Sequence, residues 1–176
     1  MKVLTNATLL TVYGLDNLVY VGGTMDISGN GLLGAASFAN VTTAENLYIE
    51  ENAYLTDIDL SSLVSVTGSV DIFLNAQLAD LQALSSLIQV DGSLTIESNS
   101  LLASVDGLEA LTSVGSNLTI EYNDALTSIS GLSAFESTGS RLYIRYNGAL
   151  CASDVSSFVG GVTVGSDLKT SDNASC

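Results

Sequence analysis

The residues best placed to do chemistry are two glutamates in identical segments, Leu-Thr-Ile-Glu at 94–97 and again at 118–121. If the two segments are neighbouring parallel strands, Glu97 and Glu121 lie about 5 Å apart. Carboxyl groups at about that separation form the catalytic pair of a retaining glycosidase. A flat sheet, however, has no cleft that excludes water, and the chain has no tryptophan to support a sugar. We therefore interpret these glutamates as part of a solvated acidic face and expect no catalysis.

Other catalytic and metal-binding patterns are missing. The chain has no histidine, so it lacks Ser-His and Cys-His pairs and the common zinc sites. Its Gly-Gly steps at 22–23 and 160–161 are typical of turns and lack the spacing of a phosphate-binding loop. Clustered oxygens attract hard cations, so calcium held by Glu50, Asp71 or Glu97 stays an alternative, although no EF-hand spacing occurs. We expect no cofactor.

Composition limits the partners. Nineteen acidic residues against four basic ones give a net charge of −15, whereas binding to a phosphate backbone needs clustered Lys and Arg. We therefore expect no nucleic-acid partner. No apolar run reaches the roughly 18 residues of a membrane span, and no secretory signal is visible at the start. We expect no membrane insertion, and a secreted form would have lost its signal or be part of a longer chain.

The elements that position these side chains follow from an internal repeat. A Leu-x-Ile-x-x-Asn motif is clearest at 94–99, 118–123 and 142–147, weaker at 25–30, 47–52 and 70–75, and degenerate at both ends. The alternation of Leu and Ile predicts a short strand in each copy. We expect the asparagines to form a buried ladder that satisfies backbone groups at each bend. Its central members are Asn30, Asn52, Asn75, Asn99, Asn123 and Asn147, flanked by Asn6 and Asn173.

After each asparagine an apolar residue recurs at every third position. In one copy these residues are Leu102, Val105, Leu108, Leu111 and Val114. A step of three drifts by about 60° around an α-helix, so this pattern cannot keep one helical face, and long 3₁₀ helices are uncommon. The spacing instead indicates short extended pieces and turns that circle a core.

The whole pattern resembles the receptor-L-domain-like branch of leucine-rich-repeat proteins over essentially the full chain. The resemblance implies a mainly β repeat solenoid: a right-handed coil with one stacked parallel sheet. It also implies a secreted or cell-surface protein that binds proteins or glycans. One departure is that no proline follows any of the asparagines. Similarity of fold alone does not name a ligand.

We expect a single domain, with about six stacked repeats of 22–24 residues over residues 1–149 and a C-terminal capping unit over residues 150–176. Cys151 and Cys176 bracket this unit, and a disulfide there would contribute on the order of 3 kcal/mol and imply an oxidising compartment. A short helix over 154–159 would begin at Ser153 or Asp154. The N-terminal coil, with apolar Met1 and Val3, is left uncapped, so this edge either continues a longer protein or packs on another subunit.

The outward strand positions are the candidate binding surface. Three of the four basic residues, Arg141, Arg145 and Lys169, are expected on outward strand positions of the last two coils, beside Tyr143 and close to Tyr122 and Tyr146 at the adjoining turns. Tyr and Arg dominate binding hot spots; the alternative is that the arginines only pair with Glu121. The candidate ligand-binding residues are Tyr48, Glu50, Asp71, Phe73, Glu97, Glu121, Arg141, Tyr143, Arg145 and Lys169.

These observations predict an extracellular or cell-surface module for binding or adhesion, which recognises a protein or a glycan through its strands. One alternative is a structural segment that self-associates end to end through the uncapped coil. A further alternative is ice binding, for which only Thr95 and Thr119 align. Asn-x-Ser/Thr sequons occur at Asn6, Asn40, Asn117 and Asn173; we expect the first and last to be buried and Asn117 to point outward.

Overall fold

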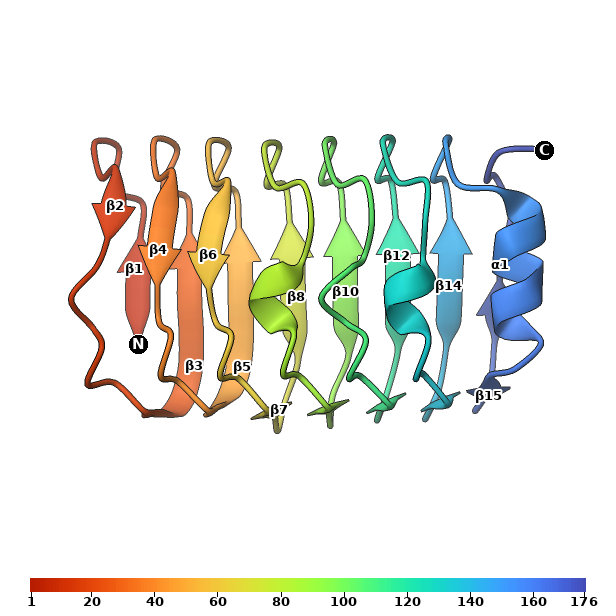
Figure 1. Ribbon diagram of the computed structural model, residues 1–176, viewed down its shortest axis with the longest axis horizontal. Helices are drawn as coiled ribbons and strands as arrows, with labels where there is room; N and C mark the ends of the chain where they lie inside the picture. The colour runs from red at the N-terminus through yellow and green to blue at the C-terminus, as the bar shows by residue number, and fades with distance from the viewer.

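The computed structural model covers all 176 residues and is a parallel β-solenoid of about 7 turns. Figure 1 shows the coils side by side, with the chain rising along the far side, crossing at the top and descending along the near side. Because the coil advances away from an observer at the N-terminus as it turns clockwise, it is right-handed. No helix has the length and apolar composition needed to cross a membrane.

Each turn contributes up to three short extended segments. The strands are β1 (Lys2–Leu4), β2 (Thr11–Val12), β3 (Tyr20–Ser28), β4 (Ala35–Ser37), β5 (Thr43–Glu50), β6 (Asp57–Asp59), β7 (Ser65–Val66), β8 (Val70–Phe73), β9 (Gln89–Val90), β10 (Leu94–Glu97), β11 (Ser113–Val114), β12 (Leu118–Glu121), β13 (Ser137–Thr138), β14 (Leu142–Arg145), β15 (Thr163–Val164) and β16 (Leu168–Lys169).

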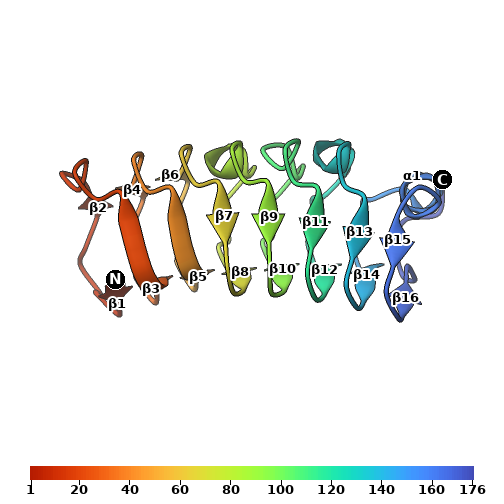
Figure 2. The same ribbon diagram turned by 90° about the horizontal axis from the view of Figure 1, so that it is seen from below.

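The strands form two sheets. A 13-stranded sheet runs in the order β15-β13-β11-β9-β7-β5-β8-β10-β12-β14-β16, with β3 pairing β5 and β1 pairing β3. The long strands β3 and β5 bend around the lower edge and so serve both arms of this sheet (Figure 2). A 3-stranded sheet of β2, β4 and β6 lies on the near side (Figure 1). We call the outward surface of β1, β3, β5, β8, β10, β12, β14 and β16 the strand face.

One continuous core of 39 buried hydrophobic residues fills the coil. In the copy from Leu102 to Val114, the five residues of the every-third pattern are each at most 1% exposed. Every third side chain thus points inward as the chain circles the core. Only two segments are 3₁₀ helices, Gln82–Leu84 and Ser130–Leu132, and each has three residues, in agreement with the preference of this conformation for short pieces.

A ladder of stacked asparagines runs along the length of the solenoid, at the ends of the strands that form the strand face. The six central asparagines are all 0% exposed. Each receives, at its side-chain oxygen, hydrogen bonds from the backbone and side-chain amides of the asparagine one coil earlier; Asn99 Oδ1, for example, accepts from Asn75 N at 3.0 Å. Each side-chain amide also donates to a strand carbonyl of the preceding coil, as Asn99 Nδ2 does to Ile72 O at 2.9 Å. The ladder therefore fixes the register of successive coils.

The residue before every ladder asparagine has a left-handed backbone. Of the eight, only Gly29 is a glycine, with φ +70°. The other seven have φ between 51° and 61°, a conformation that costs an L-residue about 1–2 kcal/mol: Thr5, Glu51, Leu74, Ser98, Tyr122, Tyr146 and Asp172. This bend aims the backbone amide of the following asparagine along the solenoid axis, toward the next side chain of the ladder.

The last turn carries the only α-helix and the only disulfide. Helix α1 (Ala152–Val159) covers the near side of this turn (Figure 1) and buries Val155 completely. Cys151 and Cys176 are bonded with Cα atoms 5.7 Å apart. The predicted helix is present, but the predicted start at Ser153 or Asp154 is wrong. Cys151 is the N-cap, because its backbone pairs with Ala174 and is held extended.

The two outermost asparagines differ from the prediction. Asn6 is exposed and Asn173 is half-buried, because each lies on a terminal coil that has a neighbour on one side only. Asn6 Nδ2 still donates to Asn30 Oδ1 at 2.9 Å, and Asn173 Oδ1 still accepts from Asn147 N at 3.2 Å. Both are thus ladder members without being core residues. The sequon asparagine Asn117 is half-buried and hydrogen-bonds Ser93 Oγ.

Candidate functional site

The strand face presents two columns of side chains in strict register. In one column, strand pairing aligns Lys2, Asp26, Tyr48, Asp71, Thr95, Thr119, Tyr143 and Lys169. In the other it aligns Leu4, Ser28, Glu50, Phe73, Glu97, Glu121 and Arg145. Parallel strands are spaced at about 4.8 Å, so each side chain has a neighbour from the next coil within contact distance. Arg141 lies one residue before β14 rather than on it, and is exposed.

Arg145 is the centre of the most ordered group on this face. Its Nε donates to Glu121 Oε1 at 2.6 Å, and its guanidinium carbon lies 5.1 Å from the ring centroids of both Tyr143 and Tyr146. The hydrogen bond that Arg145 donates to Glu121 raises the pKa of Arg145. Glu121 was expected on an open acidic face, yet it is only 6% exposed. It is thus a buried partner that orients Arg145 rather than a free carboxylate.

Tyr143 links this group to the last strand. Its hydroxyl donates to Asp167 Oδ2 at 2.6 Å, and Lys169 Nζ lies 4.9 Å from its ring centroid and 3.7 Å from Asp167 Oδ2. The pKa of Asp167 is lowered, first by the Tyr143 hydrogen bond and then by the charges of Lys169 and Arg141. Asp167 was not among the residues expected at the site. The ladder register could have indicated it, because Asp167 and Arg141 both stand six residues before a ladder asparagine.

Two tyrosines form a platform where the strand face meets the ladder. The rings of Tyr122 and Tyr146 are stacked, with centroids 4.8 Å apart and planes 9° from parallel. Both occupy the left-handed position before an asparagine, so the same backbone bend repeats in both coils and brings the rings together. Tyr122 is 47% exposed. We call Tyr122, Arg141, Tyr143, Arg145, Tyr146 and Lys169 the aromatic–basic patch.

The N-terminal half of the strand face is acidic. Burial is the main cause that raises the pKa values of Glu50, Asp71 and Glu97; the charges of Asp71 and Asp26 add to the effect at Glu50, and that of Glu121 at Glu97. Tyr48, in the same column as Asp71, also has a raised pKa, from burial and then from the Asp71 charge. The charges on this part of the face therefore repel one another.

The acidic side chains do not converge on a point. No group of three or more Asp, Glu, His or Cys side chains is close enough to hold a metal ion, because carboxylates alternate along the columns with Phe73, Tyr48 and Thr95. This arrangement gives no support to the calcium alternative. Thr95 and Thr119 pair directly but stand between Asp71 and Tyr143, so the threonine array for ice binding is two residues long.

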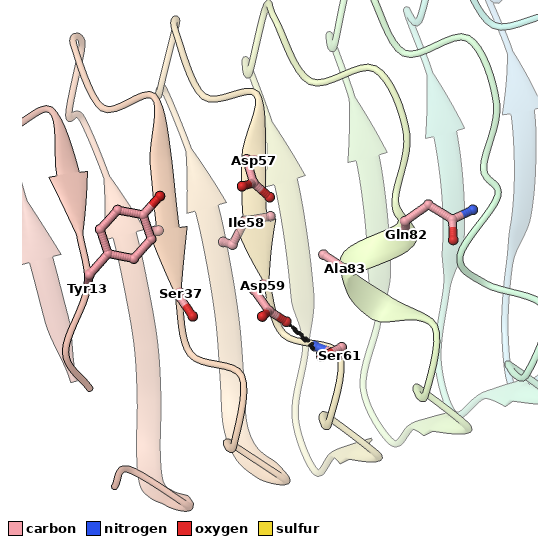
Figure 3. Close-up of a pocket in the computed structure, with 9 residues that line it drawn as sticks. Tyr13, Ser37, Asp57, Ile58, Asp59, Ser61, Gln82 and Ala83 are labelled. Carbon is pink, nitrogen blue, oxygen red and sulfur yellow. Dashed lines mark hydrogen bonds between the residues drawn. The ribbon is translucent and has the colours of Figure 1, made fainter. Parts of the chain in front are cut away.

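A shallow groove of about 290 Å³ lies on the other side of the solenoid. In Figure 3, Tyr13 leans over the strand that carries Ser37, Asp57 and Asp59 extend from β6, and Ala83 closes the far side. Asp59 Oδ1 accepts from the backbone and hydroxyl of Ser61 at 3.1 and 2.7 Å. The every-third pattern placed these residues on the coil but gave no sign of a hollow. It arises because the 3₁₀ segment projects beside the flat β4–β6 strands.

No family model matches the chain, and no curated protein or solved structure is detectably similar to it.

Proposed function

We propose that the protein is an extracellular or cell-surface binding module that recognises a protein or glycan through its strand face, in the manner of receptor-L-domain-like leucine-rich repeats. The Leu-x-Ile-x-x-Asn repeat and the stacked asparagines support this assignment of the coil. The disulfide supports an oxidising, extracytoplasmic compartment, because such bonds persist there and are rare in reducing cytosol.

The aromatic–basic patch is the observation that carries the proposal. In a chain of net charge −15, three of its four basic residues gather with three tyrosines on one end of one face. The Arg145–Glu121 ion pair is present, as the simpler alternative requires. That alternative does not account for the Tyr122–Tyr146 stack, or for a guanidinium placed between two rings with its terminal nitrogens unbonded to protein. Tyrosine and arginine held in this way are pre-organised for contact with a ligand.

The test is an array of immobilised glycans and extracellular proteins, probed with the purified chain. Wild type should bind a component that Tyr143→Ala and Arg145→Ala bind at least about tenfold more weakly, the loss of roughly 1.4 kcal/mol or more expected of hot-spot residues. Glu50→Ala and Phe73→Ala are controls in the same column as Arg145 and should bind normally. Loss of binding in the controls alone would move the site to the N-terminal half of the face. Absence of any bound component would refute the proposal.

A second candidate function, end-to-end self-association, rests on the N-terminal coil. Leu10 is 62% exposed and Leu4 38% exposed there, and the backbone of β1 pairs with a neighbour on one side only. Sedimentation velocity over a range of concentrations tests it. Association that Leu10→Ser abolishes would support this function, and a constant monomer mass would remove it.

A further inference from the structure

We infer that the aromatic–basic patch recognises a carboxylate-bearing sugar, such as a uronic acid within an oligosaccharide. This inference rests on the proposed function and narrows its ligand to one chemical class. Three features of the patch lead to it: unpaired positive charge, an aromatic platform, and polar side chains between the two.

The positive charge is only partly neutralised. Glu121 and Asp167 face Arg141, Arg145 and Lys169, which leaves the group one positive charge in excess. The Arg141 guanidinium makes no hydrogen bond and no ion pair. Only the backbone of Arg141 is bonded: its amide donates to Asn117 Oδ1 and its carbonyl accepts from Leu118 N. A guanidinium binds a carboxylate through two parallel hydrogen bonds. Arg141 is therefore the group that is free to hold an anion.

Arg141 and the aromatic platform flank the two ends of β14 (Leu142–Arg145). The five residues from Arg141 to Tyr146 would span at most about 17 Å if fully extended, and the left-handed bend at Tyr146 shortens that path. The rings of Tyr122 and Tyr146 stack on each other, so each ring has only its outer face to offer a ligand. That face carries the negative part of the aromatic quadrupole, which attracts weakly positive C–H groups such as those of a pyranose ring. A ligand that touches both ends of the patch therefore combines an anionic group with a ring, and spans more than one sugar unit.

The surface between these ends favours a glycan over an acidic protein. Its side chains are Tyr143, Arg145 and, on the next strand, Thr119. They offer hydroxyl and guanidinium groups at about 4.8 Å intervals. The centre of a protein interface is usually apolar and depleted of charge. Of the large exposed aliphatic residues of this protein, only Leu168, which precedes Lys169 on β16, lies at the patch. The hydroxyls of a sugar donate and accept hydrogen bonds and so match the chemistry of these side chains.

Calorimetric titration with two trisaccharides tests the inference: a uronic-acid trisaccharide and a neutral one of the same linkage. We expect the wild type to bind the uronate at least about tenfold more tightly, as one charge-assisted hydrogen bond predicts. Arg141→Gln should remove most of that preference, because it removes the charge that holds the carboxylate while breaking no hydrogen bond or ion pair within the protein. Lys2→Gln is the matched control: it neutralises one charge at the far end of the same face and should change affinity less than about twofold.

The outcomes separate the inference from the proposed function. Equal binding of both trisaccharides that Tyr143→Ala abolishes would overturn the anionic class and keep the strand face as a glycan site. Binding of tri-glutamate as tight as that of the uronate would also overturn the inference, because charge alone would then explain it. Failure of both sugars to bind overturns it as well, while the array experiment judges the proposed function independently.

Discussion

Replacement of Asn99 by leucine should destabilise the solenoid strongly. Leucine has nearly the same shape but no polar atoms, so the Asn75 backbone N–H, which donates to Asn99 Oδ1 at 3.0 Å, becomes a buried unpaired donor. That costs about 1–3 kcal/mol. The bonds from Asn99 Nδ2 to Ile72 O and Glu97 O are lost too, at about 0.5–1.5 kcal/mol each. The free energy of unfolding should therefore fall by about 2–6 kcal/mol.

The same substitution at the end of the ladder is the matched control. Asn6 is exposed and no group donates to its Oδ1, and Asn30 Oδ1 keeps its bond from the Asn6 backbone N–H when the side chain is changed. Asn6→Leu should thus cost less than about 1 kcal/mol, as should Thr119→Ser on the strand face. Urea unfolding followed by circular dichroism measures all three. Equal midpoints for Asn99→Leu and Asn6→Leu would refute the buried ladder as the source of stability.

Three further predictions concern the cap, the turns and the acidic half. The non-reduced protein should show no alkylation and a mass two hydrogens below that of the dithiol. The Cys151–Cys176 bond links residues 25 positions apart, so its reduction should lower the free energy of unfolding by about 3 kcal/mol. Two freely alkylated thiols would contradict the assigned bridge. Leu74→Gly should be about 1–2 kcal/mol less destabilising than the same change at a similarly exposed leucine without positive φ, because glycine relieves the left-handed strain (φ 55°). Leu101→Gly, similarly exposed but without positive φ, should destabilise by about 0.5–1 kcal/mol, and equal thermal shifts for the two would count against strain. Because the pKa of Asp71 is raised, the folded state binds a proton more readily than the unfolded state, and stability falls as pH rises above the ordinary carboxyl pKa. Asp71→Asn should therefore raise the melting temperature at pH 7 and lose this advantage toward pH 4. A melting-temperature difference between variant and wild type that stays constant from pH 7 to pH 4 would contradict the assignment.

The repeat made the coil predictable from sequence. Eight asparagines at spacings of 22–26 residues have few other physical explanations, and the alternation in Leu94–Glu97 fixes which side chains point outward. Register then follows without further information, because the period of the sequence is the period of the structure. The helix in the last turn was also visible, but its first residue depended on the Cys151–Ala174 bridge, a contact between distant residues.

The solvent exposure and contacts of individual side chains were less predictable than their positions on the coil. An outward position predicted that Glu121 would be solvated, and neighbouring side chains instead leave it 6% exposed. The left-handed bends were hidden, because seven of the eight residues that adopt them are not glycine. The Tyr122–Tyr146 stack depends on that bend, so only the closeness of both residues to the turn was foreseen. The groove beside Tyr13 could not be predicted without knowing where the 3₁₀ helix Gln82–Leu84 lies.

The central claim is that the C-terminal end of the strand face binds the ligand. The most direct test is to map the chemical-shift changes of backbone amides in the ¹⁵N-labelled protein during titration with the ligand selected by the array. The account predicts saturable shifts over Thr119–Tyr122, Arg141–Tyr146 and Asp167–Lys169, with the near-side groove at Tyr13 and Asp59 unchanged. Shifts that cluster around that groove, or around the first coil at Lys2–Leu4, while the aromatic–basic patch stays silent, would contradict it.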